Sequence, residues 1–273
     1  MNVQVHGPGP AEPFLGARDL FETERDIERP VTINIVADPD ERTRVSHTDE
    51  GHRLTISRQA ATSAMARELA LHEYAHMLHN EFNHPSHTQS TEEAIFLALA
   101  GRTVEQRKLT HCHQIANHMK DIYADDVWLA VAPGDKLVAF LESSLAAALA
   151  DHSRSSLTWP QPAGSVDPTE GGSGVTDESG VSTARRRPGA DPEITAVNAA
   201  FALGLVERHG LVEEDHRLYD LAHAAAADAP GVEFESFRRL FRSLSADPDT
   251  SEYRKVLVEA TRTYAGDSGQ AAD

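Results

Sequence analysis

The chain has 273 residues, enough for one large domain or two smaller ones, and its 40% hydrophobic content argues against wholesale disorder. Its net charge of −18, from 43 acidic and 25 basic side chains, repels nucleic acids and anionic membranes, so we expect neither as a partner. The lysines are few: Lys108, Lys120, Lys136 and Lys255. An acidic, lysine-poor surface is typical of adaptation to high salt, and the competing interpretation is a preference for basic substrates.

Three further features bear on location and redox chemistry. Cys112 is the sole cysteine, which excludes an intramolecular disulfide and a cysteine-based zinc knuckle. Residues 1–12 lack the basic start and apolar core of a signal peptide. The most apolar stretch, Leu137–Ala150, contains Glu142 and is too short to span a bilayer. We therefore expect a cytoplasmic protein.

The N-terminal elements mix a helix with strands. Residues 13–28 have the pattern of a short amphipathic helix. Two strand-like runs follow, Val31–Val36 and His52–Arg58, joined by a polar, turn-rich loop. This arrangement predicts a small hairpin or sheet edge.

Helices dominate from Thr62 onward, where the apolar period becomes three to four residues. One stripe of the first helix is formed by Met65, Leu69, His72, His76 and His79. Ser90 begins the next helix with a capping box, and Gly101 ends it. Thr103 and Gln106 can open the next helix with the same kind of cap, and it is expected to run to about Val127; a further helix is expected from Lys136 to Ala150.

The chain divides into three parts by composition. Residues 1–152 hold the elements above, whereas residues 153–191 are rich in Gly, Ser, Pro, Thr and Asp and predict a flexible linker or insertion. Residues 192–273 predict a helical C-terminal region, with Pro192 at the first helical position. The helices expected there are Glu193–His209, Glu213–Ala227, Glu233–Leu244 and Ser251–Ala265. The fold class is therefore α+β, predominantly helical, with a small sheet.

The chemistry is carried by His72-Glu73-Tyr74-Ala75-His76, an HExxH motif on a helix. Residues four apart lie on one helix face, so both imidazoles can reach one tetrahedral Zn²⁺. Glu73 is then placed to take a proton from the water that zinc activates, as a general base. The alternative is a helix with two surface histidines and no metal.

A catalytic zinc site needs a third protein ligand and leaves one position open. The extended HExxHxxGxxH pattern is absent, because His79 and Phe82 stand where its glycine and histidine would be. His84 and His87 would serve only if the chain doubled back at once. Glu92 and Glu93 are further candidates, although capping and the helix dipole already explain them at a helix start.

The preferred third ligand lies on the later helix. Asn117, Asp121 and Asp125 are spaced four apart on a helix with apolar faces, so they need a polar partner if they are buried. A metal and its histidines would supply one. The alternative is a stripe that faces solvent.

Asp121-Ile122-Tyr123-Ala124-Asp125 resembles the ExxAD segment of gluzincin peptidases, with Asp in place of the ligand Glu. The resemblance implies a zincin-like fold for residues 1–152, Asp121 as the third zinc ligand and Asp125 as the residue that orients a zinc-bound histidine. The shorter Asp121 demands a closer approach of the two helices, and Asp125 remains an alternative ligand. The whole chain is also similar to an uncharacterised haloarchaeal family of predicted metallopeptidases.

We therefore expect a zinc-dependent metallopeptidase that acts on a peptide or protein. Tyr74, Tyr123 and His118 are candidates for stabilising the oxyanion, and an edge strand for holding an extended peptide. One alternative is a non-catalytic zinc-binding module that regulates or scaffolds, although it would have no need of Glu73. Another is a zinc hydrolase of a non-peptide amide.

Overall fold

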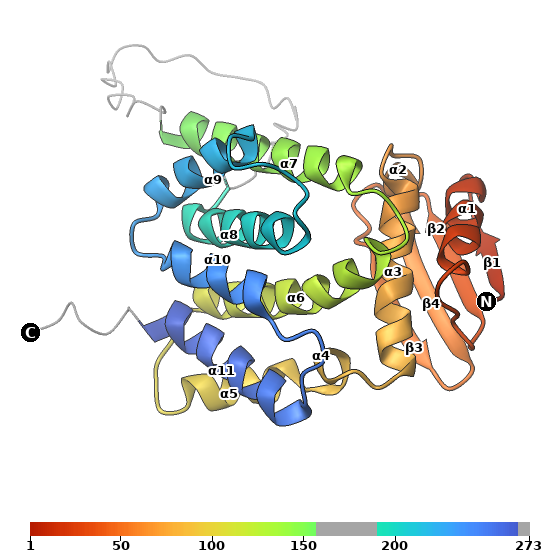
Figure 1. The fold of residues 1–273 in the computed structure, drawn as a ribbon, viewed down its shortest axis with the longest axis horizontal. Helices are drawn as coiled ribbons and strands as arrows, with labels where there is room; N and C mark the ends of the chain where they lie inside the picture. Colours follow the sequence, from red (N-terminus) through yellow and green to blue (C-terminus); the bar gives the residue numbers. More distant parts are fainter. Residues whose placement is uncertain (157–189, 267–273) are drawn as a thin grey trace, which may run out of the picture.

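The computed structural model describes residues 1–156 and 190–266. It shows a helix-rich α+β protein with one four-stranded sheet in its described part, which confirms the expected fold class. The sheet lies at one end of the molecule and most helices at the other, with α3 (Ala66–Glu81) between them (Figure 1). The helix with the HExxH motif is thus the junction of the two parts.

The sheet has the strand order β1-β2-β4-β3. Its strands are β1 (Val3–His6), β2 (Val31–Val36), β3 (Arg44–Thr48) and β4 (Gly51–Ser57). β2 pairs in parallel with β1 and β4, while β3 is the antiparallel edge strand beside β4. The prediction that the two strand-like runs form a hairpin was therefore wrong, because the hairpin partner of β4 is β3, in the segment that looked like a loop.

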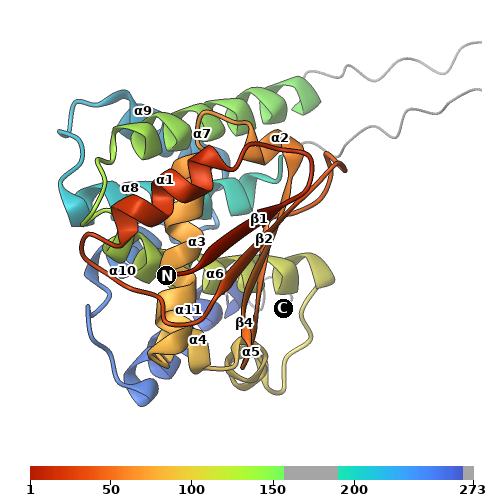
Figure 2. The same cartoon turned by 90° about the vertical axis from the view of Figure 1, so that its right-hand side faces the viewer.

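One face of the sheet forms a core with α1 (Glu12–Phe21) and α3, which lie side by side on it (Figure 2). Alternate residues of β2 are buried, as expected of a strand with one covered face. The first helix is shorter than the range 13–28 that the sequence predicted. Tyr74 of α3 lies in this core, where its hydroxyl donates to the Phe14 carbonyl (3.1 Å).

The middle of the chain folds into helices, some of which begin with a side-chain cap and some without one. Ser90 caps α5 by accepting from the Glu93 N–H (3.1 Å), as its sequence predicted. The long sixth helix packs across α3 and supplies the second wall of the site described below. The elements after β4 are α2 (Arg58–Ala61), α3, α4 (Pro85–Thr88), α5 (Thr91–Leu99), α6 (Gln106–Trp128) and α7 (Asp135–Ser156).

The C-terminal helices pack back on the earlier ones. They are α8 (Pro192–His209), α9 (Arg217–Asp228), α10 (Phe234–Ser243) and α11 (Thr250–Gly266). α8 lies against α6, α7, α9 and α10, and α11 lies against α5 and α6. Asp191 caps α8 by accepting from the Glu193 N–H (3.0 Å). The linker expected at 153–191 lies outside the described residues, except for the end of α7 and residues 190 and 191.

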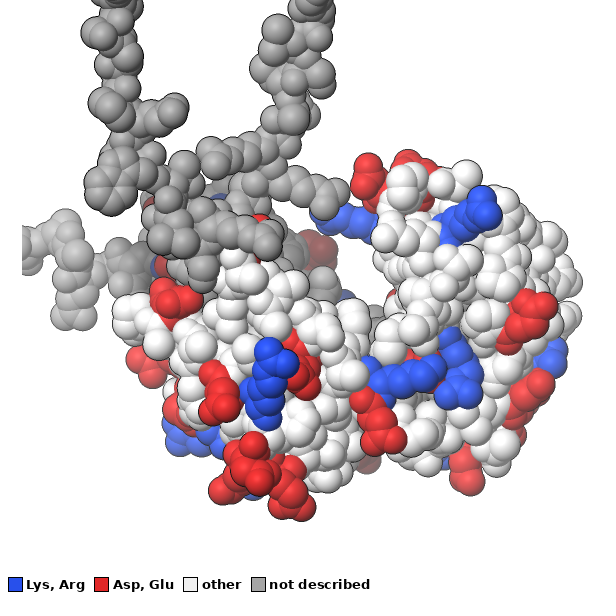
Figure 3. Space-filling model, turned by 90° about the horizontal axis from the view of Figure 1, so that it is seen from above, with Lys and Arg blue, Asp and Glu red and all other residues white. Residues whose placement is uncertain are grey.

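The surface agrees with the charge of the sequence. Acidic side chains are spread over both parts of the face shown in Figure 3, and that face is hollowed between the part with the sheet and the part with α7. Cys112 is a free, buried thiol. Among the described helices, none has both the length and the apolar character needed to cross a membrane.

Candidate metal centre

Three side chains from two crossing helices converge on one point. His72 and His76 of α3 place their Nε2 atoms 2.9 Å apart. Asp121 of α6 places Oδ1 at 3.7 Å from His72 Nε2 and 3.4 Å from His76 Nε2. One ligand atom of each lies within 4.8 Å of the others, a spacing suited to a shared metal ion. The short Asp121 side chain thus reaches both histidines.

Asp125, one turn after Asp121, holds the far side of His72. Its Oδ1 accepts from His72 Nδ1 (2.8 Å) and from Trp128 Nε1 (2.6 Å), and its side chain is buried. With the proton of His72 on Nδ1, the lone pair on Nε2 points to the shared centre. The geometry therefore gives Asp125 an orienting role, and makes Asp121 the residue next to both imidazole Nε2 atoms.

His76 is held by a second chain of hydrogen bonds. Its Nδ1 lies 2.7 Å from His87 Nε2, His87 Nδ1 lies 2.8 Å from Ser86 Oγ, and Ser86 Oγ lies 2.7 Å from His84 Nδ1. One proton assignment is consistent with all three contacts: His76 Nδ1–H donates to His87 Nε2, His87 Nδ1–H donates to Ser86 Oγ, and the Ser86 hydroxyl donates to His84 Nδ1. This leaves His76 Nε2, like His72 Nε2, with a free lone pair.

His84 and His87, considered above as ligands, thus lie behind His76 rather than at the shared centre. The chain does double back directly after α3, at Asn83, whose φ of 52° is in the left-handed region that Asn tolerates. The N-terminal turn of α4 then brings His87 against His76. Glu93 is exposed at the start of α5 and outside the donor group. Asn117 is also exposed, so the expected polar stripe narrows to Asp121 and Asp125.

The donor set fits a cation. In the assignment above, two imidazole lone pairs and a carboxylate face one another with no proton between them, which is unfavourable unless positive charge lies among them. Burial alone would lower the pKa of His72, but Asp125 and Asp121 raise it well above its ordinary value. Burial likewise opposes the ionisation of Asp121, yet contacts with His118, His72 and His76 hold its pKa well below the usual range.

Glu73 lies on the neighbouring side of α3 and is partly buried. Its pKa is raised, chiefly because burial disfavours the carboxylate, while His72 and His76 partly offset this. Its carboxylate takes part in no hydrogen bond or ion pair with the residues that the structure describes. Glu73 is therefore close enough to feel the charge of the centre and is free to bond a water or substrate.

Of the candidates for an oxyanion-stabilising role, His118 is the one beside the centre. Its Nδ1 is buried, makes no hydrogen bond and lies 3.6 Å from Asp121 Oδ2, and its ring stacks on Phe201 of α8 (centroids 4.3 Å apart). Tyr74 is instead tied to the sheet core, and Tyr123 packs against His84 and Tyr253. The sequence could point to His118 by its spacing from Asp121, but carried no signal for Phe201.

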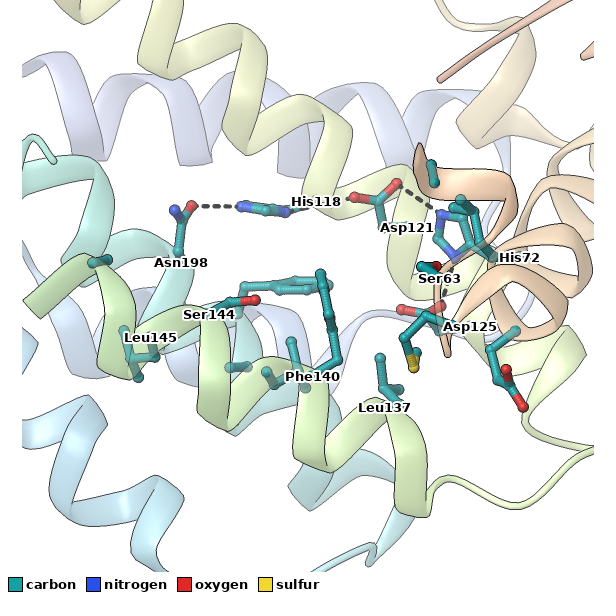
Figure 4. A pocket seen from close by; sticks show the side chains of 18 of the residues that line it. Ser63, His72, His118, Asp121, Asp125, Leu137, Phe140, Ser144, Leu145 and Asn198 are labelled. Carbon is teal, nitrogen blue, oxygen red and sulfur yellow. Dashed lines mark hydrogen bonds and ion pairs between the residues drawn. The ribbon is translucent and has the colours of Figure 1, made fainter. Parts of the chain in front are cut away.

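A cavity of about 730 Å³ opens beside the donors (Figure 4). Its lining comes from α3 and α6, including His72, Asp121 and Asp125, from α2 and the residues beside it, and from α7 and α8. His76 and Glu73 are not among its lining residues. Two of the three candidate donors, His72 and Asp121, are thus accessible from a pocket that α8 helps to complete.

The fold and this donor set define a helix-rich α+β protein with a candidate metal centre between α3 and α6. The model of one protein family, described as a family of unknown function (DUF5781), matches residues 1–266. The chain therefore belongs to the DUF5781 family. No curated protein and no solved structure matches the chain.

Proposed function

We propose that this protein is a zinc-dependent metallopeptidase. The observation that carries the proposal is the convergence of His72 Nε2, His76 Nε2 and Asp121 Oδ1, with each histidine oriented through its Nδ1. Two imidazoles and a carboxylate are the donor types of catalytic zinc sites, which keep a fourth position open. The gluzincin-like spacing of Asp121 and Asp125 supports the same conclusion.

When bound, zinc would supply Lewis acidity, lowering the pKa of water towards neutrality and polarising a substrate carbonyl. Glu73 takes the proton of the attacking water and passes it to the leaving amine. Its raised pKa makes it a stronger base than an ordinary carboxylate, which suits that role. Asp125 and the chain through His87 keep the two imidazoles in the tautomer that binds metal.

A purely structural zinc site is less well supported. Such a site closes its coordination with four protein ligands, whereas in residues 1–156 and 190–266 the group around His72 has three. His87 bonds to His76 Nδ1 on the far side of that ring. A zinc hydrolase of a non-peptide amide would use the same chemistry and differs only in substrate.

The test is the zinc content of the purified protein in high-salt buffer, measured beside His76→Ala. We expect one zinc per chain in the wild type and none in the variant, because His76 is a direct ligand. Zinc in neither protein, even after reconstitution, would contradict the proposal.

Catalysis is tested with Glu73→Gln. This variant should keep its zinc and lose about 10²- to 10⁴-fold in the rate of peptide hydrolysis, the usual contribution of a general base. Exposed Glu92→Gln, on α5, is the matched control and should behave as wild type. Full activity in Glu73→Gln would rule out its role as base.

A further inference from the structure

The cavity beside the metal donors has two unlike walls (Figure 4). Along one wall, polar side chains follow one another from His72 through Asp121 and His118 to Asn198. The opposite wall, on α7, is mainly apolar, and Ser144 is its one polar residue among those that the structure describes. The apolar residues of this wall are Leu137, Phe140, Leu141, Leu145 and Ala148. Such a pocket suits a ligand with an apolar side and a hydrogen-bonding side.

The polar wall ends in a group with unused donors. Asn198 Oδ1 accepts from His118 Nε2 (2.8 Å) and from Gln114 Nε2 (2.9 Å), which fixes the orientation of the amide. The Asn198 NH₂ group has no hydrogen-bond acceptor among the residues that the structure describes. A ligand in the cavity that offers a carbonyl oxygen would supply one.

The apolar wall includes an aromatic side chain left open to solvent. Phe140 is 51% exposed although its neighbours Leu137 and Leu145 are buried. The volume of about 730 Å³ lies within the range of pockets that enclose whole small ligands, so there is room for a large apolar group. Such a group would cover Phe140 and displace water from the α7 wall.

We propose that this cavity binds a bulky apolar side chain next to the scissile bond of a peptide, and that the Asn198 NH₂ group donates to a backbone carbonyl of that peptide. This rests on the proposed function, since it names the substrate class of the same site. A fatty acyl chain would fill the apolar wall but has a single carbonyl at its end, whereas a peptide has a backbone carbonyl beside each apolar side chain. A peptide satisfies both walls.

The experiment is calorimetric binding of three ligands without metal-binding groups: acetyl-Phe-Leu-amide, acetyl-Ser-Gly-amide and octanamide. It uses the full-length Glu73→Gln protein, to prevent turnover, as purified and again after chelation of metal. The apolar peptide should bind about 10- to 100-fold more tightly than the polar one, the value of burying one large apolar side chain. The preference should persist without metal, because the cavity is formed by the helices.

Two variants and one control locate the binding. Ala148→Trp on α7 fills the cavity and should abolish the preference, whereas Ala147→Trp, exposed and outside the lining, should keep it. Asn198→Asp retains the acceptor for His118 and Gln114 but removes the donors, and should weaken binding of acetyl-Phe-Leu-amide about tenfold. Thermal unfolding confirms that each variant is folded.

The outcomes separate the two proposals. Equal binding of both peptides, or an affinity for acetyl-Phe-Leu-amide that Ala148→Trp leaves unchanged, would overturn the inference even if zinc is present. Tighter binding of octanamide than of either peptide would overturn it in favour of an acyl ligand. A protein that lacks zinc but shows the predicted preference would contradict the metallopeptidase and support the peptide-binding cavity.

Discussion

Two clusters of the described residues bring histidine and carboxylate groups together, and they differ in what neutralises them. At the first, His72, His76 and Asp121 converge with no cationic side chain among them. At the second, His111, Asp191 and Glu193 are equally close to one another. Proximity of donor atoms alone therefore does not distinguish a metal site from other polar clusters.

The second cluster already contains its cation. Arg107 of α6 donates to Asp191 Oδ2 (2.7 Å) and to Glu193 Oε2 (3.0 Å), and Tyr264 of α11 bonds both His111 and Glu193. These contacts join α6, the start of α8 and α11. The cluster is thus an ion-pair clamp that holds helices together, whereas at the first cluster an external cation would have to do what Arg107 does here.

The substitution Asp121→Ala gives the strongest test of whether the first cluster, unlike the second, binds a metal ion. We expect zinc affinity to fall by at least about 100-fold, because loss of an orienting residue alone costs 10- to 100-fold and we propose Asp121 as a direct ligand. Asn117→Ala, exposed one turn earlier on the same helix, is the control and should keep wild-type affinity. An affinity unaltered in Asp121→Ala would move the third ligand elsewhere, with Asp125 the next candidate.

Asp125→Asn tests the orienting role by a smaller change. The amide can still accept from His72 and Trp128 but lacks the charge that favours the Nδ1–H tautomer of His72, so zinc affinity should fall about 10-fold. Competition with a chelating dye measures both variants on one scale. A loss as large as that of Asp121→Ala would instead identify Asp125 as a ligand.

The sequence predicted those parts of the fold that depend on neighbouring residues. The helix expected to begin at Thr103 and Gln106 and to run to about Val127 is Gln106–Trp128, without the expected side-chain cap, and Pro192 is the first residue of α8 as expected. Strand pairing was predicted wrongly, because the hairpin partner β3 is an exposed, polar edge strand without apolar alternation, and the four residues of β1 are too few for a periodic signal.

The residues of the candidate site were likewise predicted only where their pattern is local in the sequence. His72, His76, Asp121 and Asp125 were found because residues four apart share a helix face. The bond from His87 to His76 depends on the chain reversal at Asn83, and Asn198 reaches His118 only because α8 docks on α6, eighty positions later in the chain. Neither contact leaves a pattern in local spacing.

Arg107→Gln addresses the clamp. Losing two partly exposed ion pairs should lower the free energy of unfolding by about 1 kcal/mol, while zinc content stays at one per chain. Denaturant unfolding and metal analysis on the same sample provide both measurements. Binding of a second zinc by this variant would show that the clamp is itself a metal site that Arg107 fills.

The two clusters should also respond to acid in different ranges. Burial opposes the ionisation of Asp191, but Arg107 lowers the pKa of this carboxyl below its ordinary value. The folded state therefore binds a proton at Asp191 less readily than the unfolded state does. The stability that the clamp contributes is therefore present at neutral pH and is lost as pH falls below roughly 4, the unfolded value for Asp. The stability difference between wild type and Arg107→Gln should shrink from pH 7 to pH 3.

At the metal centre, the raised pKa of His72 makes protons compete with zinc at a higher pH. Zinc affinity should therefore begin to decline at a pH above the ordinary pKa of histidine, roughly 6.5, well before the clamp weakens. Titrating zinc release and denaturant stability over one pH series measures both. A zinc affinity that stays constant down to the pH at which the clamp fails would mean that the carboxylates at His72 do not act as we infer.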